Sequence, residues 1–228
     1  MPAPQDVATS PVRPEPTVLT TPSPVEPSVP TAPVPPTESP VNPDVPEGMA
    51  GTVLVPPEAL LGAADLPFTP TSTNDYGPYV KNRTMVTSLC GDGAEPGEEL
   101  AVGGRQIFHI GTGDDSLATV VRVFEADGAR QQLDFLRASL GTCEYVTTYT
   151  PQDAGGLPGD DALIGTAPSA FVEGGTAVIG AVRDGSTTVG IQIDVEGDAA
   201  AATALARGLL ARGHELLVAS GLPAAHRG

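Results

Sequence analysis

Residues 176–195 read TAVIGAVRDGSTTVGIQIDV, and this stretch decides the fold. Two apolar runs, TAVIGAVR and TTVGIQIDV, flank a short polar segment that contains Asp184-Gly185. An Asp-Gly pair between two such runs predicts an antiparallel β-hairpin with its turn at that pair. In the second run, apolar side chains alternate with polar or small ones: Val189, Ile191, Ile193 and Val195 against Thr188, Gly190, Gln192 and Asp194. The hairpin therefore belongs to a sheet with one packed face and one polar face.

Further strands are expected on the N-terminal side of this hairpin. Residues 80–89, 105–110 and 117–124 are rich in β-branched and aromatic side chains and are separated by loops rich in glycine and acidic residues. Residues 143–150 and 162–172 give weaker strand signals. Together with the hairpin, these runs predict a sheet built largely from antiparallel neighbours.

Three helices are expected among these strands. Pro57 suits the first turn of a short helix, and a long helix rich in alanine and leucine begins near Asp198. Between them, Asp127 can cap a helix that ends at Gly141, with Ala129, Leu133, Leu136 and Leu140 at helical spacing. The order of elements predicts an α+β fold: a mainly antiparallel twisted sheet with helices packed on one side.

The N-terminal part of the chain has a different composition. Fifteen of the 25 prolines lie at or before Pro46, and all nine aromatic residues lie at or after Phe68. A segment without aromatic rings cannot bury enough apolar surface to offset the entropy lost on ordering. We therefore expect a disordered Pro/Thr-rich linker or stalk over residues 1–49, a single α+β domain over 50–222 and a frayed tail over 223–228. A spacer is the favoured role of the stalk; a PxxP ligand or a sugar-bearing stalk are the alternatives.

The charge and hydropathy of the chain limit its partners. A net charge of −17 opposes contact with nucleic acid and with anionic membrane surfaces. No window of about 18 apolar residues exists that could span a membrane, and MPAPQDVATS is not a signal peptide. We expect an export signal, lipobox or membrane helix upstream, so that membrane attachment depends on an anchor that is not present in this chain. The alternative is a cytosolic protein with a disordered tail.

The chain has two cysteines, Cys90 and Cys143. In an extracytoplasmic domain they are expected to form a disulfide, whereas in a cytosolic one they would be buried thiols. Their spacing excludes a CxxC redox motif and leaves no second pair for a zinc site. A bridge would close a loop of 54 residues and stabilise the fold by roughly 4 kcal/mol in the chain-entropy model.

Several stretches together resemble a known family. These are ALLGAADLP at 59–67, VVRVFEADGARQQLDFLRASLGTC at 120–143, the hairpin and the long last helix. The combination resembles the PknH-like extracytoplasmic sensor domain of actinobacteria, which occurs on transmembrane Ser/Thr kinases and in related lipoproteins. The resemblance implies an α+β sandwich with a ligand-binding cleft. The family usually has two disulfides, whereas this chain has one cysteine pair, no tryptophan and no kinase motif.

No pattern in the sequence identifies a catalytic or metal site. Ser169 lacks the GxSxG context, and the three histidines, His109, His214 and His226, belong to no catalytic motif. The acid pairs Asp114-Asp115 and Asp160-Asp161 lack the EF-hand order and are interpreted as solvated loops. We therefore expect no catalytic residue, no metal and no cofactor.

Arg122 and Arg183 are the most suggestive charged residues, since each lies near the end of an apolar strand. They could bind an anionic ligand in a cleft, or simply balance the many acids as exposed side chains. The favoured function is a non-enzymatic sensor-type domain that binds a small molecule, a cell-wall component or a protein at the cell envelope. An envelope hydrolase of unrecognised type and a structural wall protein remain the alternatives.

Overall fold

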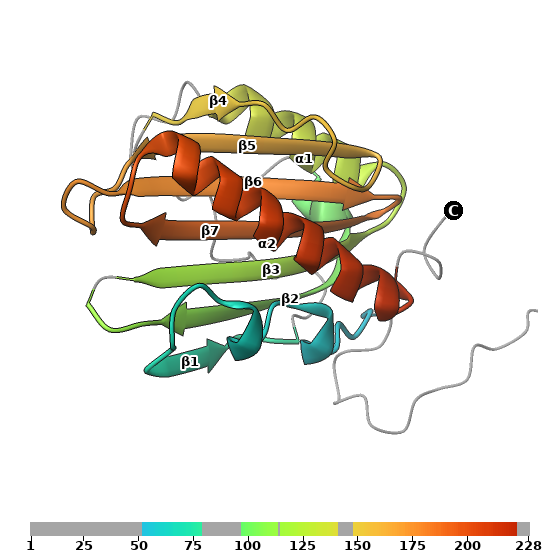
Figure 1. The fold of residues 1–228 in the computed structure, drawn as a ribbon. Helices are drawn as coiled ribbons and strands as arrows, with labels where there is room; N and C mark the ends of the chain where they lie inside the picture. Colours follow the sequence, from blue (N-terminus) through green and yellow to red (C-terminus); the bar gives the residue numbers. More distant parts are fainter. Residues whose placement is uncertain (1–51, 79–96, 114, 141–147, 223–228) are drawn as a thin grey trace, which may run out of the picture. The chain divides into compact units, whose positions relative to one another are not determined.

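The structure is a computed structural model that describes residues 52–78, 97–113, 115–140 and 148–222. All of them lie in one compact unit, Asp44–Gly228, and the chain's other unit is Met1–Pro43. The strands of the unit form one seven-stranded sheet in the order β1-β2-β3-β7-β6-β5-β4, and every neighbouring pair is antiparallel (Figure 1). The elements are η1 (Pro57–Ala59), η2 (Ala63–Asp65), β1 (Ser72–Asp75), η3 (Glu98–Leu100), β2 (Ala101–Ile110), β3 (Ser116–Phe124), α1 (Gly128–Ser139), β4 (Thr150–Gln152), β5 (Asp161–Pro168), β6 (Thr176–Asp184), β7 (Thr187–Val195) and α2 (Ala199–Ala219).

The predicted hairpin lies at the centre of the sheet. β6 pairs with β7 from Thr176↔Val195 to Asp184↔Thr187, so Gly185 and Ser186 are the two central residues of the turn. Asp184 and Gly185 thus both belong to the four-residue turn, as expected, with Asp184 as its first residue. Gly185 has φ 60°, a left-handed conformation that glycine adopts without strain.

The sheet has helices on both faces. α2, η1 and η2 lie together on one face, where Leu60, Leu61 and Leu210 join the apolar side chains of β3, β6 and β7 in the larger core. α1 lies on the opposite face, where Leu133 and Leu136 pack with alternate residues of β5 and β6 (Figure 1). The expected α+β class with an antiparallel sheet is confirmed, and helices do gather on one face as expected. The position of α1 on the other face is the added finding.

Two glycines let the helices approach the sheet closely. A Cβ at Gly180 would lie 2.7 Å from Leu210 of α2, and a Cβ at Gly165 would lie 2.8 Å from Leu140 beside α1. Both distances are shorter than a carbon contact allows. Small residues in the strands therefore determine where each helix rests.

Some expected elements differ in detail. The short helix after Pro57 is two single 3-10 turns, and β1 was not expected from its polar sequence STND. Asp198 caps α2 by accepting a hydrogen bond from the Ala201 amide at 2.9 Å, whereas the Asp127 side chain contacts Arg130 and Gln131 instead. The expected strand at 80–89 and the first part of that at 143–150 lie outside the described residues.

Candidate ligand-binding site

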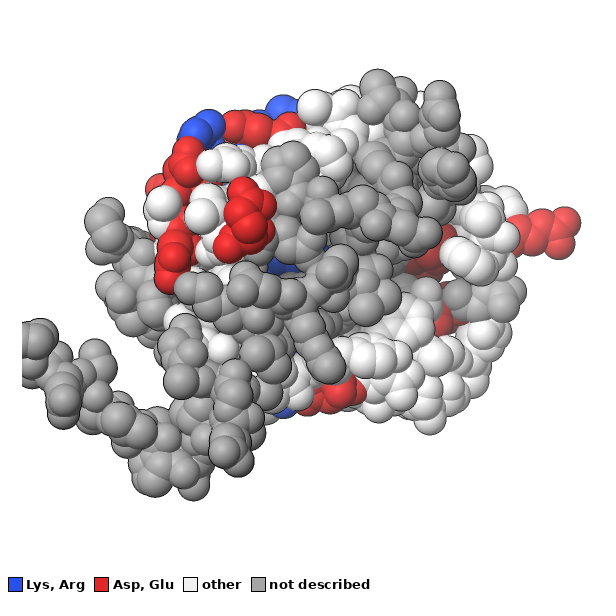
Figure 2. All heavy atoms as spheres, turned by 180° about the vertical axis from the view of Figure 1, so that it is seen from behind, with Lys and Arg blue, Asp and Glu red and all other residues white. Residues whose placement is uncertain are grey.

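The face of the sheet that carries α1 is only partly covered by that helix. α1 packs over β5 and β6 and over one end of β3, where Gln132 and Leu136 approach Arg122. The same face continues along β2, β3 and β7 to the opposite end of the strands, where Ser116 pairs with Asp194. Viewed from behind, acidic side chains are more numerous than basic ones on the visible surface (Figure 2). The end of the sheet beyond α1 is where a ligand could enter.

A pocket of about 400 Å³ lies at this end of the sheet. Its walls come from four neighbouring parts of the chain: β2, the β2–β3 turn with the start of β3, the loop between β5 and β6, and β7. The lining residues are Phe108, Ile110, Gly113, Asp115, Ser116, Phe171, Gln192 and Asp194. The volume and the mixture of rings, aliphatic groups and a few polar groups are typical of a small-molecule site. We refer to it as the Phe171 pocket.

Asp194 is the most unusual residue of the Phe171 pocket. Its side chain is deeply buried, with 4 % of the residue exposed. The Ser169 hydroxyl donates a hydrogen bond of 2.6 Å to its Oδ1 atom. Among the described residues no donor contacts the other oxygen, Oδ2. Oδ2 is not among the fully buried unpaired atoms of the described residues, so it reaches the pocket surface, where it offers a ligand a charged acceptor.

Ser169 holds the outer wall of the pocket in place. Its oxygen accepts hydrogen bonds from the backbone amides of Phe171 at 3.0 Å and Val172 at 2.9 Å while its proton goes to Asp194. The Ser169 and Gly175 backbones are joined by a further bond of 3.0 Å. These contacts fix a tight turn that presents the Phe171 ring, 67 % exposed, at the mouth. Because the Ser169 proton is already donated to a carboxylate, the hydroxyl is a structural group.

The negative charge of Asp194 reaches the buried Tyr149 as well. Burial raises the pKa of the Tyr149 hydroxyl, and the charge of Asp194 raises it further. The phenol therefore stays protonated at neutral pH. Tyr149 belongs to the same apolar cluster as Leu133 of α1 and Leu163 of β5. The sheet face between this cluster and Asp194 is therefore lined by apolar side chains and has a negative electrostatic potential.

Further acidic side chains surround the mouth. Asp115 also lines a second hollow of about 590 Å³, together with Glu173 and Glu196. In the described part of the chain, no group of three or more acidic, histidine or cysteine side chains is arranged to hold a metal ion. The acids make the approach to the Phe171 pocket negative without forming a cation cage of their own.

The two arginines suggested by the sequence occupy the other end of this face. Arg122 is 3 % exposed and lines a small cavity with Gln132 and Thr188, whose hydroxyl donates to the Gln132 carbonyl at 3.2 Å. Arg183 lies across the sheet from the same threonine and donates to Asp160 at 3.3 Å and to the Gly185 carbonyl at 3.1 Å. Arg122 is thus buried rather than exposed, and Arg183 stabilises the hairpin turn.

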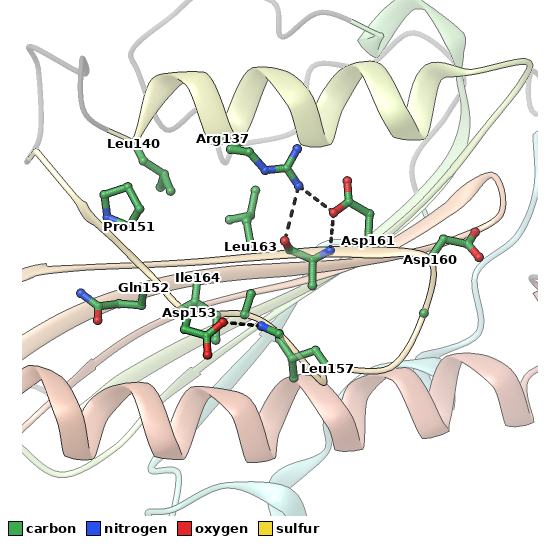
Figure 3. Close-up of a pocket in the computed structure, with 14 residues that line it drawn as sticks. Arg137, Leu140, Pro151, Gln152, Asp153, Leu157, Asp160, Asp161, Leu163 and Ile164 are labelled. Carbon is green, nitrogen blue, oxygen red and sulfur yellow. Dashed lines mark hydrogen bonds and ion pairs between the residues drawn. The ribbon is translucent and has the colours of Figure 1, made fainter. Parts of the chain in front are cut away.

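A larger hollow of about 570 Å³ opens at the β4–β5 edge of the sheet (Figure 3). Its charged groups bind one another: Arg137 donates to Asp161 at 2.8 Å and to the Ala162 carbonyl at 3.4 Å, while Asp161 accepts from the Ala162 amide at 2.8 Å. These contacts satisfy the backbone amide and carbonyl of Ala162, where β5 extends beyond its pairing with β4. The edge hollow is therefore a weaker ligand site than the Phe171 pocket.

The described histidines have structural contacts. His109 is buried, with Nδ1 3.1 Å from the Thr73 hydroxyl and Nε2 3.2 Å from the Leu61 carbonyl. Because a carbonyl can only accept, Nε2 carries the proton and the ring joins β2 to the segment beside η1. His214 of α2 contacts Asp184 at 3.1 Å. Within the described residues neither histidine hydrogen-bonds a serine, as a hydrolase triad would require.

The remaining predicted site residues are only partly described. Cys90, Cys143, Asp114 and His226 lie outside the described residues, so the disulfide stays a prediction. Asp160 lies in an exposed loop, as expected, and pairs with Arg183, whereas Asp161 begins β5 and pairs with Arg137. Sequence reasoning placed Gln192 and Asp194 on a polar strand face but did not connect them with Phe171, since four parts of the chain that are separate in sequence meet there.

Of the comparisons with family models, curated proteins and solved structures, only the last gives a match. No family model matches the chain, and no curated protein matches it. Among solved structures, the chain is similar to the crystal structure of the extracellular domain of PknH from Mycobacterium tuberculosis. The two are 16% identical, the match covers 72% of this chain and 100% of that one, and the TM-score is 0.44. This similarity is too low to transfer a site or an activity. In the described part of the chain, no helix combines the length and the apolarity needed to cross a membrane.

Proposed function

We propose that residues 50–222 form a non-enzymatic, sensor-type domain that binds a ligand in the Phe171 pocket. The observation that carries this proposal is Asp194, a buried carboxylate that lines the pocket and has one oxygen held by Ser169 and the other without a donor among the described residues. A carboxylate oxygen that is held in one direction and reaches a pocket is a ready acceptor for a donor group of a ligand. The rigid turn at Ser169 supports the same function, because a preformed wall lowers the entropy lost on binding.

We further propose that the domain lies outside the cytoplasm on a Pro-rich spacer. The composition of residues 1–49 and the two cysteines support this location. The same proposal includes the disulfide between Cys90 and Cys143. Ellman titration of unfolded, unreduced protein from an oxidising compartment tests it: no free thiol is expected, and two free thiols per chain would contradict the bridge.

The binding function is tested by NMR with the isotopically labelled full chain. Amide spectra are recorded while matched small amines, carboxylic acids, alcohols and sugars are added one at a time. At least one class is expected to shift the amides of residues 108–116, 169–175 and 192–194. Replacing Phe171 by Ala removes an exposed wall of the pocket without touching the core, so it should weaken binding while leaving the remaining spectrum intact.

A matched control comes from the edge hollow. Leu157→Ala alters the lining of that hollow and should leave binding unchanged. The proposal fails if no class shifts the three segments, or if the shifts map to the edge hollow and respond to Leu157→Ala.

A further inference from the structure

We propose that the ligand of the Phe171 pocket carries an ammonium group on an apolar body, and that this cation binds Asp194 Oδ2. The inference rests on the proposed binding function and names the chemical class that the site would select. It follows from three features of the pocket: its charges, its apolar walls and the fixed direction of the carboxylate.

The charges of the site favour a cation. Asp194 is the buried acid, Asp115 lies at the rim of the same pocket, and Glu173 and Glu196 line the adjoining hollow. The described lining residues include no lysine or arginine. An anionic ligand would meet only like charges, whereas an ammonium group would gain a charge-assisted hydrogen bond to Oδ2 in a poorly solvated place.

The walls of the site favour an apolar body attached to that cation. Phe108 and Ile110 come from β2, and the Phe171 ring stands at the mouth from the opposite loop. Aromatic faces attract ammonium groups as well as alkyl chains. Gln192 and Ser116 add neutral polar groups on the floor. The volume of about 400 Å³ accommodates a small molecule or one long side chain.

Ser169 gives the carboxylate its direction. The hydroxyl is fixed by two backbone amides and donates to Oδ1, so Asp194 cannot rotate freely to find another donor. The acceptor is thus oriented before the ligand arrives, and little side-chain entropy is lost on binding.

The test compares three ligands of the same shape: hexylamine, 1-hexanol and hexanoate. Each ligand is titrated into the full chain, calorimetry measures its affinity, and the shifts in the amide NMR spectrum identify where it binds. Hexylamine is expected to bind about tenfold or more tightly than hexanol, as one charge-assisted hydrogen bond implies, and hexanoate more weakly than either. Asp194→Asn preserves the shape and the acceptor for Ser169. It should reduce hexylamine binding about tenfold and leave hexanol unchanged.

Asp115→Asn is the matched control for general attraction to an acidic surface. This variant removes one charge at the pocket rim and should weaken hexylamine binding only about twofold. Added salt should suppress this twofold effect, because it screens exposed charges. A capped tripeptide with a central lysine, compared with its norleucine counterpart, distinguishes a protein side chain from a free amine as the source of the ammonium group.

The outcomes separate this inference from the binding function. Binding of hexylamine that depends on Asp194 supports it, with or without binding of the lysine peptide. If hexanol or hexanoate binds in the pocket as tightly as the amine, or if Asp194→Asn and Asp115→Asn have equal effects, the inference is wrong while the site stands. If none of the ligands used in either titration series shifts residues 108–116, 169–175 and 192–194, both the inference and the function fail.

Discussion

The contact between Ser169 and Asp194 can be tested directly through stability. Replacing Ser169 by Ala removes the hydrogen bond to the buried carboxylate and the acceptor for two backbone amides. A hydrogen bond to a charged group contributes about 1.5–3 kcal/mol, and the exposed Phe171 amide can turn to water at little cost. We therefore expect Ser169→Ala to lower the free energy of unfolding by about 2 kcal/mol.

Urea unfolding followed by circular dichroism measures this loss. For a domain of this size the midpoint should fall by about 1 M, with an unchanged slope. Thr203→Ala is the control, since the Thr203 hydroxyl bonds only the exposed Ala199 carbonyl within α2 and its loss should stay within about 0.5 kcal/mol. In a double-mutant cycle with Asp194→Asn, the coupling should be about 1 kcal/mol. A loss below about 0.5 kcal/mol for Ser169→Ala, or no coupling, would refute the view that this hydroxyl fixes Asp194.

The remaining predictions concern glycines and one ion pair. Gly103→Ala would place a Cβ 2.1 Å from the Val53 carbonyl oxygen, so we expect a loss of about 1–3 kcal/mol in urea unfolding. At Gly208 of α2 a Cβ would meet no other atom, so Gly208→Ala should instead raise the free energy of unfolding by about 0.5–1 kcal/mol. If both substitutions changed the stability in the same direction, the close contact between Gly103 and Val53 would be contradicted. Burial alone would raise the pKa of Asp65, but hydrogen bonds from Arg212 and a backbone amide, with the arginine charge, lower it overall. Asp65→Asn should therefore cost at most about 1 kcal/mol at pH 7, and its difference from the unchanged protein should vanish as the pH falls below about 4. A difference that persisted at low pH would show that the carboxylate charge is not the cause.

The sequence predicted the regular part of the sheet well and its irregular edges poorly. β3 and β6 are apolar runs of strand length, and β7 and both long helices carry apolar residues at regular spacing, so all five gave clear signals. β1 was missed because STND is fully exposed and forms a strand only by pairing with β2. Asp127 occupies the N-cap position of α1 as expected, but its carboxylate accepts hydrogen bonds from Arg130 and Gln131 and none from the helix backbone.

The candidate site was predicted only in fragments. Alternation along residues 187–195 correctly separated Gln192 and Asp194 from the strand residues of the larger core. The expected polar face was wrong, because Thr188, Gly190 and Asp194 are buried on the side of the sheet that carries α1.

Phe171 was expected at the end of a weak strand over 162–172, whereas β5 ends at Pro168 and Phe171 lies in the loop that follows. A single aromatic residue there gives no sign of a pocket. The arginines that looked most functional lie at the other end of the face, where one is buried and the other supports the hairpin turn.

The sequence by itself determined the α+β class, the central antiparallel hairpin and the acidic character of the chain. These follow from local propensity, side-chain periodicity and charge, which need no knowledge of distant contacts. Only the tertiary structure decided that α1 lies across the sheet from α2 and that a loop serine binds a strand aspartate beside two phenylalanines. Such contacts join residues more than 20 positions apart, and their geometry depends on strand order and helix packing, which no local pattern encodes.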